Sequence, residues 1–189
     1  MTLPLVVTDD PAYQFSAQAL ACLSSVTAAL PNPPGNVCYR VGGEVAHDID
    51  MVRDLCCEGL AYVSLGDTYP SSSSFPEQDI VRQANTICPP PAWAQQLKLG
   101  IIRCVPVVMD DTGAMPSCTD WTLAWQQNVV DTIALRQVAC CLRVWLVGQV
   151  GLLEGMSMVI ERQTQGTPLG GCVERSVTIS LQQPNCDCG

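Results

Sequence analysis

The spacing of apolar positions along the chain predicts two helices. The first begins at Asp9-Asp10-Pro11, where an acidic cap precedes a proline at the first helical position. Apolar residues then recur every three or four positions until the proline-rich run 31–34, so we expect a helix over about residues 11–30. A longer helix follows Thr119 and Asp120, which can cap it. Its broad apolar stripe contains Trp121, Trp125, Val130, Ile133, Ala134, Val138, Cys141 and Trp145.

The long helix is expected to lie across one face of a sheet and to turn this stripe toward the core. Asp131 and Arg143 fall largely outside the stripe, as do Gln126 and Gln127. If the rings are buried in this way, the tryptophans of the stripe belong to the core of the fold.

Short runs of β-forming residues predict the strands. Residues 37–41 and 59–65 are two such runs, the second ended by Gly66-Asp67, and a third run at 97–108 is expected to end near Pro106. Apolar and polar residues alternate in the last part of the chain, over residues 156–163 and again over 173–181. This alternation predicts a C-terminal β-hairpin, because successive side chains of a strand point to opposite faces.

These elements predict a single α+β domain over residues 1–189, with a mixed or antiparallel sheet packed by the N-terminal helix and the long helix. Four serines between two prolines predict a mobile surface loop near residues 67–78. Residues 182–189 are expected to form an irregular tail. Residues 48–58 leave helix and strand open as alternatives.

The charge balance limits the partners that the protein can have. The chain carries 18 acidic and 9 basic residues, for a net charge of −9, and its arginines are scattered along the sequence. Proteins that track a DNA groove cluster their lysines and arginines, so this mode of binding is disfavoured. An acidic surface instead repels DNA and lets it pass without sticking.

The sequence gives no sign of a membrane or secretion signal. The first residues lack a basic region, and Pro4 breaks their short apolar run. The longest apolar stretch, around residues 119–147, contains charged residues such as Arg136 that are costly at membrane depth. We therefore expect no membrane span.

Twelve cysteines are the unusual feature of the composition. Most lie within apolar patterns, so we expect reduced, buried thiols that pack as small core residues. Cys140 and Cys141 are helical neighbours whose side chains diverge by about 100°, which disfavours a bond between them. Cys172, Cys186 and Cys188 leave two alternatives open, a zinc site or a disulfide that ties the tail to the hairpin.

No group of residues forms a convincing active site. The single histidine, His47, lies in an acidic run typical of a solvated turn, and the pairs Asp9-Asp10 and Asp110-Asp111 are typical of caps and loops. The glycine-containing segment 166–171 matches no phosphate-binding motif and is expected to connect the hairpin strands. The sequence thus predicts no catalytic, cofactor-binding or metal-binding residues, and a protein that is not an enzyme.

The order of elements resembles that of the tail-terminator proteins of long-tailed bacteriophages. These are small α+β subunits, and the segment GGCVERSVTISL at 170–181 is similar to their last strand in phages of GC-rich hosts. The resemblance implies a hexameric ring, without a cofactor, that caps the tail tube and ends its polymerisation. The expected partners are further copies of the chain, the tail tube protein, a head-tail connector or stopper protein, and genome DNA passing through the lumen without specific binding. The expected location is the neck of the virion, with assembly in the host cytoplasm.

Three other functions are left open. The chain could be another neck or connector protein of the virion, which also predicts assembly into a larger particle. It could be a disulfide-rich secreted binding protein, which predicts few free thiols. An enzyme would need a cleft that gathers residues distant in the sequence.

Overall fold

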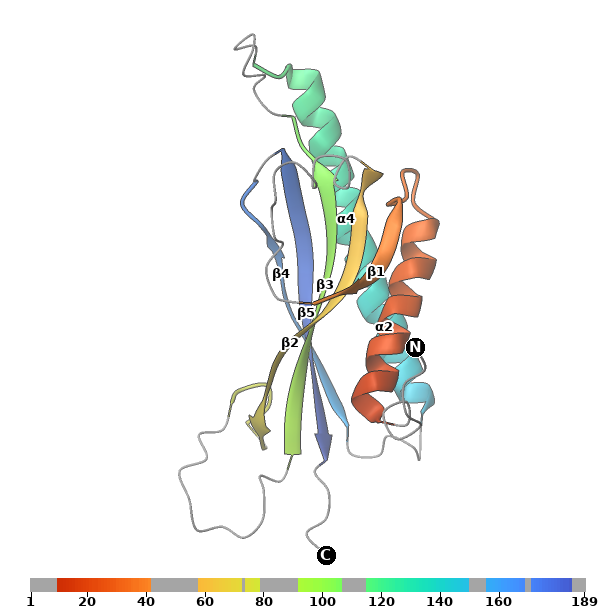
Figure 1. The fold of residues 1–189 in the computed structure, drawn as a ribbon, viewed down its shortest axis with the longest axis vertical. Helices are drawn as coiled ribbons and strands as arrows, with labels where there is room; N and C mark the ends of the chain where they lie inside the picture. The colour runs from red at the N-terminus through yellow and green to blue at the C-terminus, as the bar shows by residue number, and fades with distance from the viewer. Residues whose placement is uncertain are drawn as a thin grey trace, which may run out of the picture.

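The chain folds into one five-stranded sheet with two helices. The computed structural model describes residues 10–41, 58–72, 74–78, 92–106, 115–149, 156–168 and 171–184. Both helices pack against the same face of the sheet, and one of them is much longer than the other (Figure 1). The predicted α+β class, with its N-terminal helix, long helix and C-terminal hairpin, is confirmed.

Helix α2 begins where the sequence indicated. It spans Pro11–Ala28, and the side chain of Asp10 accepts a hydrogen bond from the backbone N–H of Ala12 at 2.8 Å. This bond satisfies one of the N–H groups that the first turn of any helix leaves without an intrahelical partner. Asp10 is therefore a helix cap, as predicted.

Helix α4 spans Cys118–Gly148, and its cap differs from the prediction. Ser117, rather than Thr119 or Asp120, is the N-cap residue. The Ser117 hydroxyl accepts from the N–H of Asp120 at 3.2 Å, and the Asp120 carboxylate accepts from the N–H of Ser117 at 2.9 Å. This reciprocal arrangement is a capping box, which satisfies two backbone donors at once.

The sheet has the strand order β1-β2-β3-β5-β4. Strands β1 and β2 are parallel, and all other neighbours are antiparallel, so the sheet is mixed as predicted. Strands β4 and β5 form the predicted C-terminal hairpin (Figure 1). The strands are β1 (Asn36–Arg40), β2 (Leu60–Ser71), β3 (Ala92–Cys104), β4 (Ser157–Gln165) and β5 (Cys172–Pro184).

Three strands are longer than the sequence indicated. Strand β2 continues through a bulge after Leu65 and pairs with β3 as far as Ser71, so the first part of the segment expected to be a loop, from residue 67, is strand. Strand β3 begins at Ala92 instead of 97, and β5 extends to Pro184 into the expected tail. Each strand is extended by hydrogen bonds to a neighbour distant in the sequence, which local composition does not reveal.

The core lies between the helices and one face of the sheet. Alternate residues of β5 point into it, as the period-two pattern predicted. The buried cluster consists of Phe15, Ala19, Cys22 and Leu23 from α2, Ala134, Leu135, Val138, Ala139 and Leu142 from α4, and Ala61, Val63, Leu97, Leu99, Ile101, Val177, Ile179 and Leu181 from the sheet.

A disulfide joins the two helices inside this core. Cys22 of α2 is bonded to Cys141 of α4, across a sequence separation of 119 residues. Cys104 and Cys172 are disulfide-bonded as well. The remaining described cysteines are free and exposed, namely Cys38, Cys118 and Cys140.

The expectation of mostly reduced, buried thiols is therefore wrong for the described residues, because the buried sulfurs among them are oxidised. The sequence pattern detected the burial but not the pairing, since it does not reveal which cysteines of separate helices meet. Cys140 and Cys141 are not bonded to each other, as expected from their divergence on a helix.

The double substitution Cys22→Ala and Cys141→Ala should lower the free energy of unfolding by about 3–5 kcal/mol, because the bond closes a long loop in the unfolded chain. Urea denaturation without reductant measures this change. Cys38→Ala is the matched control, and it should change the stability by less than about 0.5 kcal/mol, because this thiol is free and exposed. Equal effects of the two variants would show that the bond adds nothing.

Candidate functional site

The buried part of helix α4 begins at Asp131. Every buried residue of the helix lies at or after this position, and the part before it extends past the ends of the strands (Figure 1). Trp121 and Trp125 are therefore exposed, and Trp125 is 65% exposed. The prediction that these two rings belong to the core is wrong, because the residues of this segment that meet the sheet are Ala124, Gln127 and Asn128 instead.

The C-terminal part of the predicted stripe is correct except at Ile133, which is 40% exposed. Ala134 and Val138 are buried in the core, and Trp145 packs against it with its ring centroid 6.3 Å from that of Phe15. The stripe thus identified the inner face of α4 after residue 131. It failed before that point because an apolar pattern does not indicate where the sheet ends.

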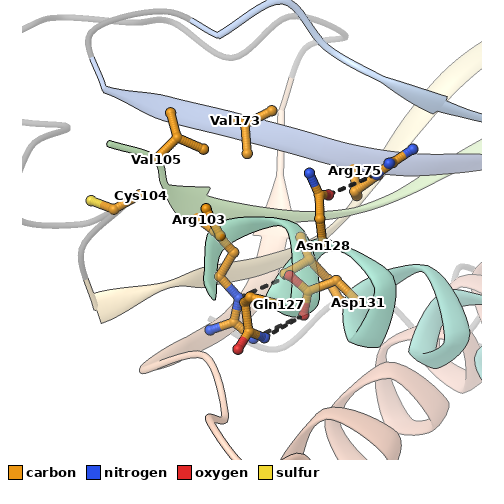
Figure 2. A pocket seen from close by; sticks show the side chains of 10 residues that line it. Arg103, Cys104, Val105, Gln127, Asn128, Asp131, Val173 and Arg175 are labelled. Atoms are coloured by element: carbon orange, nitrogen blue, oxygen red, sulfur yellow. Dashed lines mark hydrogen bonds and ion pairs between the residues drawn. The ribbon is translucent and has the colours of Figure 1, made fainter. Parts of the chain in front are cut away.

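A buried ion pair attaches α4 to the end of β3. Arg103, at the end of β3, donates to both carboxylate oxygens of Asp131 at 3.1 Å (Figure 2). Asp131 is only 1% exposed, and the side-chain amide of Gln127 also donates to it. The expectation that Asp131 lies outside the buried stripe is wrong, because a carboxylate can be buried when it is paired and hydrogen-bonded.

The backbone around Arg103 is shaped to admit its guanidinium group. Gly59 has a φ of +81°, and a Cβ atom there would lie 2.6 Å from Nη1 of Arg103. Both the conformation and the close approach favour glycine. Nη2 of Arg103 also donates to the backbone carbonyl of Asn32 at 2.9 Å. The guanidinium thus links β3, α4 and the segment that follows α2.

A small hollow lies next to this ion pair. Asn128 and Arg175 line it together with Arg103 and Asp131, and the Asn128 side-chain oxygen accepts from Nε of Arg175 at 2.7 Å (Figure 2). The hollow is about the size of one water molecule. Its polar side chains hydrogen-bond to one another, so they attach α4 to the sheet. The hollow has no room for an organic substrate.

A second polar cluster lies on the face of the sheet opposite the helices. Tyr62 lies over Gly100, its partner on β3, where a Cβ atom would be 2.5 Å from the ring. The space above this glycine brings together the Tyr62 hydroxyl, the Lys98 ammonium and the Glu174 carboxylate. Tyr62 donates to Oε1 of Glu174, and Lys98 lies 2.6 Å from the same oxygen.

The electrostatics of this cluster oppose a catalytic role. Burial raises the pKa of Tyr62 well above its ordinary value, and the hydrogen bond to Glu174 raises it further. Burial also tends to raise the pKa of Glu174, but hydrogen bonds from Lys98, Tyr62 and Ser176 hold it below its ordinary value. The phenol therefore stays protonated and the carboxylate stays charged, which suits a structural contact rather than proton transfer.

The other residues that the sequence singled out are only partly described. Gly166 connects the hairpin strands, and its N–H donates to the carbonyl of Glu174 at 2.9 Å. Among the described residues, no group of three His, Cys, Asp or Glu side chains is placed to hold a metal ion. His47, Asp9, Asp110, Asp111, Cys186 and Cys188 lie outside the described residues.

The most distinctive surface of the described chain is an exposed apolar stripe on α4, which we call the outward face. Its residues follow one another at three-, four- and seven-residue intervals, so they share one side of the helix. The sequence analysis did not separate this stripe from the inner one, because α4 is apolar on both sides. The outward face consists of Trp121, Trp125, Val129, Ile133, Cys140, Val144 and Val147.

No protein-family model matches the chain, and no curated protein matches its sequence. In the described part of the chain, neither helix combines the length and the apolar character needed to cross a membrane.

Asp131→Ala should lower the free energy of unfolding by about 3–5 kcal/mol, because it leaves the Arg103 guanidinium buried without its partner. The double variant Arg103→Met with Asp131→Leu should recover most of this loss, since it removes both charges. Urea denaturation at low protein concentration measures both effects. Glu77→Ala, at an exposed acid, is the control and should change stability by less than about 0.5 kcal/mol. An Asp131→Ala variant as stable as this control would contradict the assigned role.

Proposed function

We propose that the protein is a structural subunit of a phage virion, a tail terminator that forms a hexameric ring on the end of the tail tube. The ring would stop tube polymerisation and offer a docking face to the connector or stopper protein on the head side. The observation that carries this proposal is the outward face of α4. Soluble monomers rarely leave a long stripe with two tryptophans in water, whereas subunits of assemblies bury such surfaces against their neighbours.

The order of elements supports the choice among assemblies. An N-terminal helix, a sheet, a long helix and a closing hairpin follow one another, which is the order that suggested tail terminators. The segment that resembled their last strand forms β5, in the middle of the paired strands. A subunit held by such a sheet can offer helices and loops to its neighbours without disturbing its core.

The charge supports passage of DNA through the ring. Duplex DNA carries about one negative charge per 1.7 Å of its axis and would be held by a cationic wall. The net charge of −9 favours a lumen that repels DNA instead. The proposal therefore expects the acidic side chains to be denser toward the lumen than toward the outer surface.

A second candidate, a disulfide-rich secreted binding protein, is favoured by the disulfides. Cys22 and Cys141 are bonded, and Cys104 and Cys172 are oxidised too. Against it, Cys38, Cys118 and Cys140 are free and exposed, which is unusual in a secreted framework. Thiol titration of the denatured, unreduced protein separates the two candidates, because a complete framework leaves almost none of the twelve cysteines reactive.

The purified protein should form a closed ring of about six times the 20.3 kDa subunit mass. Mass photometry measures the particle, and negative-stain microscopy shows whether it has a central hole. Added to the polymerising tail tube protein of the same phage, the ring should give shorter tubes with a ring at one end.

An unrelated acidic protein of similar size is the control, and it should leave the tube length unchanged. A strictly monomeric particle at high concentration would overturn the proposal. So would a ring that leaves tube length unchanged, because it would assign the protein to another place in the neck.

A further inference from the structure

We infer that the outward face of α4 is the contact between neighbouring subunits, so that it docks on a second copy of this chain. The inference rests on the proposed ring and deepens it by naming the surface that closes it. Three features of the face carry it, namely its apolar character, its extent and its charge.

Helix α4 carries apolar side chains on its exposed side as well as on its buried side. After residue 131 its inner face packs on the sheet through Leu135, Val138 and Leu142, which are fully buried. The opposite face of the same segment carries Ile133, Val144 and Cys140, all exposed. Apolar side chains that gather on the exposed side of a helix mark a contact with another surface. In the single chain this side is uncovered.

The extent of the face matches a subunit contact. From Trp121 to Val147 it runs about 39 Å along the helix at 1.5 Å per residue. Its side chains expose roughly 600–700 Å² of apolar surface, if a whole tryptophan presents about 250 Å². This is near the roughly 800 Å² that each partner buries in a stable protein interface. A short peptide would leave much of the stripe in water, whereas a second copy of this chain is long enough to cover it.

The charges on the face favour this same protein as the occupant. Arg136 and Arg143 are exposed within the outward face, because Arg136 lies seven residues after Val129 and Arg143 seven residues after Arg136. The two acids of α4 lie elsewhere, Asp131 on the inner face and Asp120 in the first turn. A face whose only charged side chains are arginines is complementary to an acidic surface, and a second copy with its excess of acids provides one.

The arrangement also fits a ring. A contact between two different patches of the same chain repeats from subunit to subunit and closes when its rotation completes a circle. The first turns of α4 project beyond the ends of the strands, so they can reach the body of a neighbour without moving the core (Figure 1). In this arrangement Trp121 and Trp125 would be the buried aromatic anchors that dominate the energy of many interfaces.

Substitutions on the two sides of α4 test the inference, and the purified wild-type ring is the reference. Trp125→Ser and Val144→Ser should each weaken association about tenfold or more by mass photometry over a dilution series. Leu123→Ser is the matched control, because Leu123 is 59% exposed but its position two residues before Trp125 turns it by about 200°. Its association should stay within about twofold of the wild type. Circular dichroism should show all three variants folded, because each replaced side chain is exposed.

Charge reversal tests the electrostatic part without removing apolar surface. Arg136→Glu combined with Arg143→Glu should weaken association, most strongly at low salt, because screening removes the effect at high salt. Cys140 adds a direct readout. Maleimide should label it about tenfold more slowly in the wild-type ring than in the Trp125→Ser variant, while labelling of Cys38, which lies on β1, should not change.

The outcomes separate the inference from the proposed function. A ring that persists in Trp125→Ser and Val144→Ser, with Cys140 labelled as fast as Cys38, would overturn the inference and leave the ring proposal standing. A wild-type ring whose Cys140 is labelled as fast as Cys38 until the tail tube protein is added would assign the face to that protein and overturn a second copy as its occupant. A wild-type chain that stays monomeric at high concentration would overturn the proposed function itself.

Discussion

The buried ion pair between Arg103 and Asp131 fixes α4 near the end of the sheet. Arg103 lies next to the end of β3, so the helix meets the sheet near its edge and continues beyond it. Removing one partner of such a pair leaves the other charge buried without compensation. The free-energy cost of that state holds the helix in its position on the sheet. The Cys22–Cys141 disulfide holds the other half of the same helix to α2. With both attachments made, the first turns of α4 have no sheet beneath them.

The position of α4 determines which of its side chains stay exposed. In the two polar clusters described above, the carboxylates already have partners. Asp131 is bound by Arg103 and Gln127, and Glu174 by Lys98 and Tyr62. The outward face of α4 is the surface that we propose for a partner. The proposed role is therefore assembly, and the acidic balance suits an assembly through which DNA moves.

Sequence reasoning recovered the elements that depend on local patterns. Asp10 as a cap, the two helices and the alternating hairpin strands follow from rules that act within a few residues. It failed where the outcome depends on distant segments. The position of Asp131 could not be predicted because its partner lies 28 residues earlier in another element, and the pairing of Cys22 with Cys141 requires knowing which helices touch.

The wrong prediction for Trp125 also arose because the outcome depends on segments outside the local pattern. An apolar stripe indicates that a surface will be covered, but not whether the cover comes from the same chain or from another one. The sequence analysis assigned Trp125 to the core, and in the single chain it lies in water. In the proposed ring both statements hold, since the ring would supply the cover that the subunit lacks.

Single-particle cryo-electron microscopy of the purified particle shows directly whether α4 forms the contact between subunits. We expect a closed ring in which the outward face of α4 from each subunit is buried against its neighbour and the lumen is predominantly acidic. A monomer, or a ring in which Trp121 and Trp125 remain in water and the lumen is lined mainly by arginines, would contradict it.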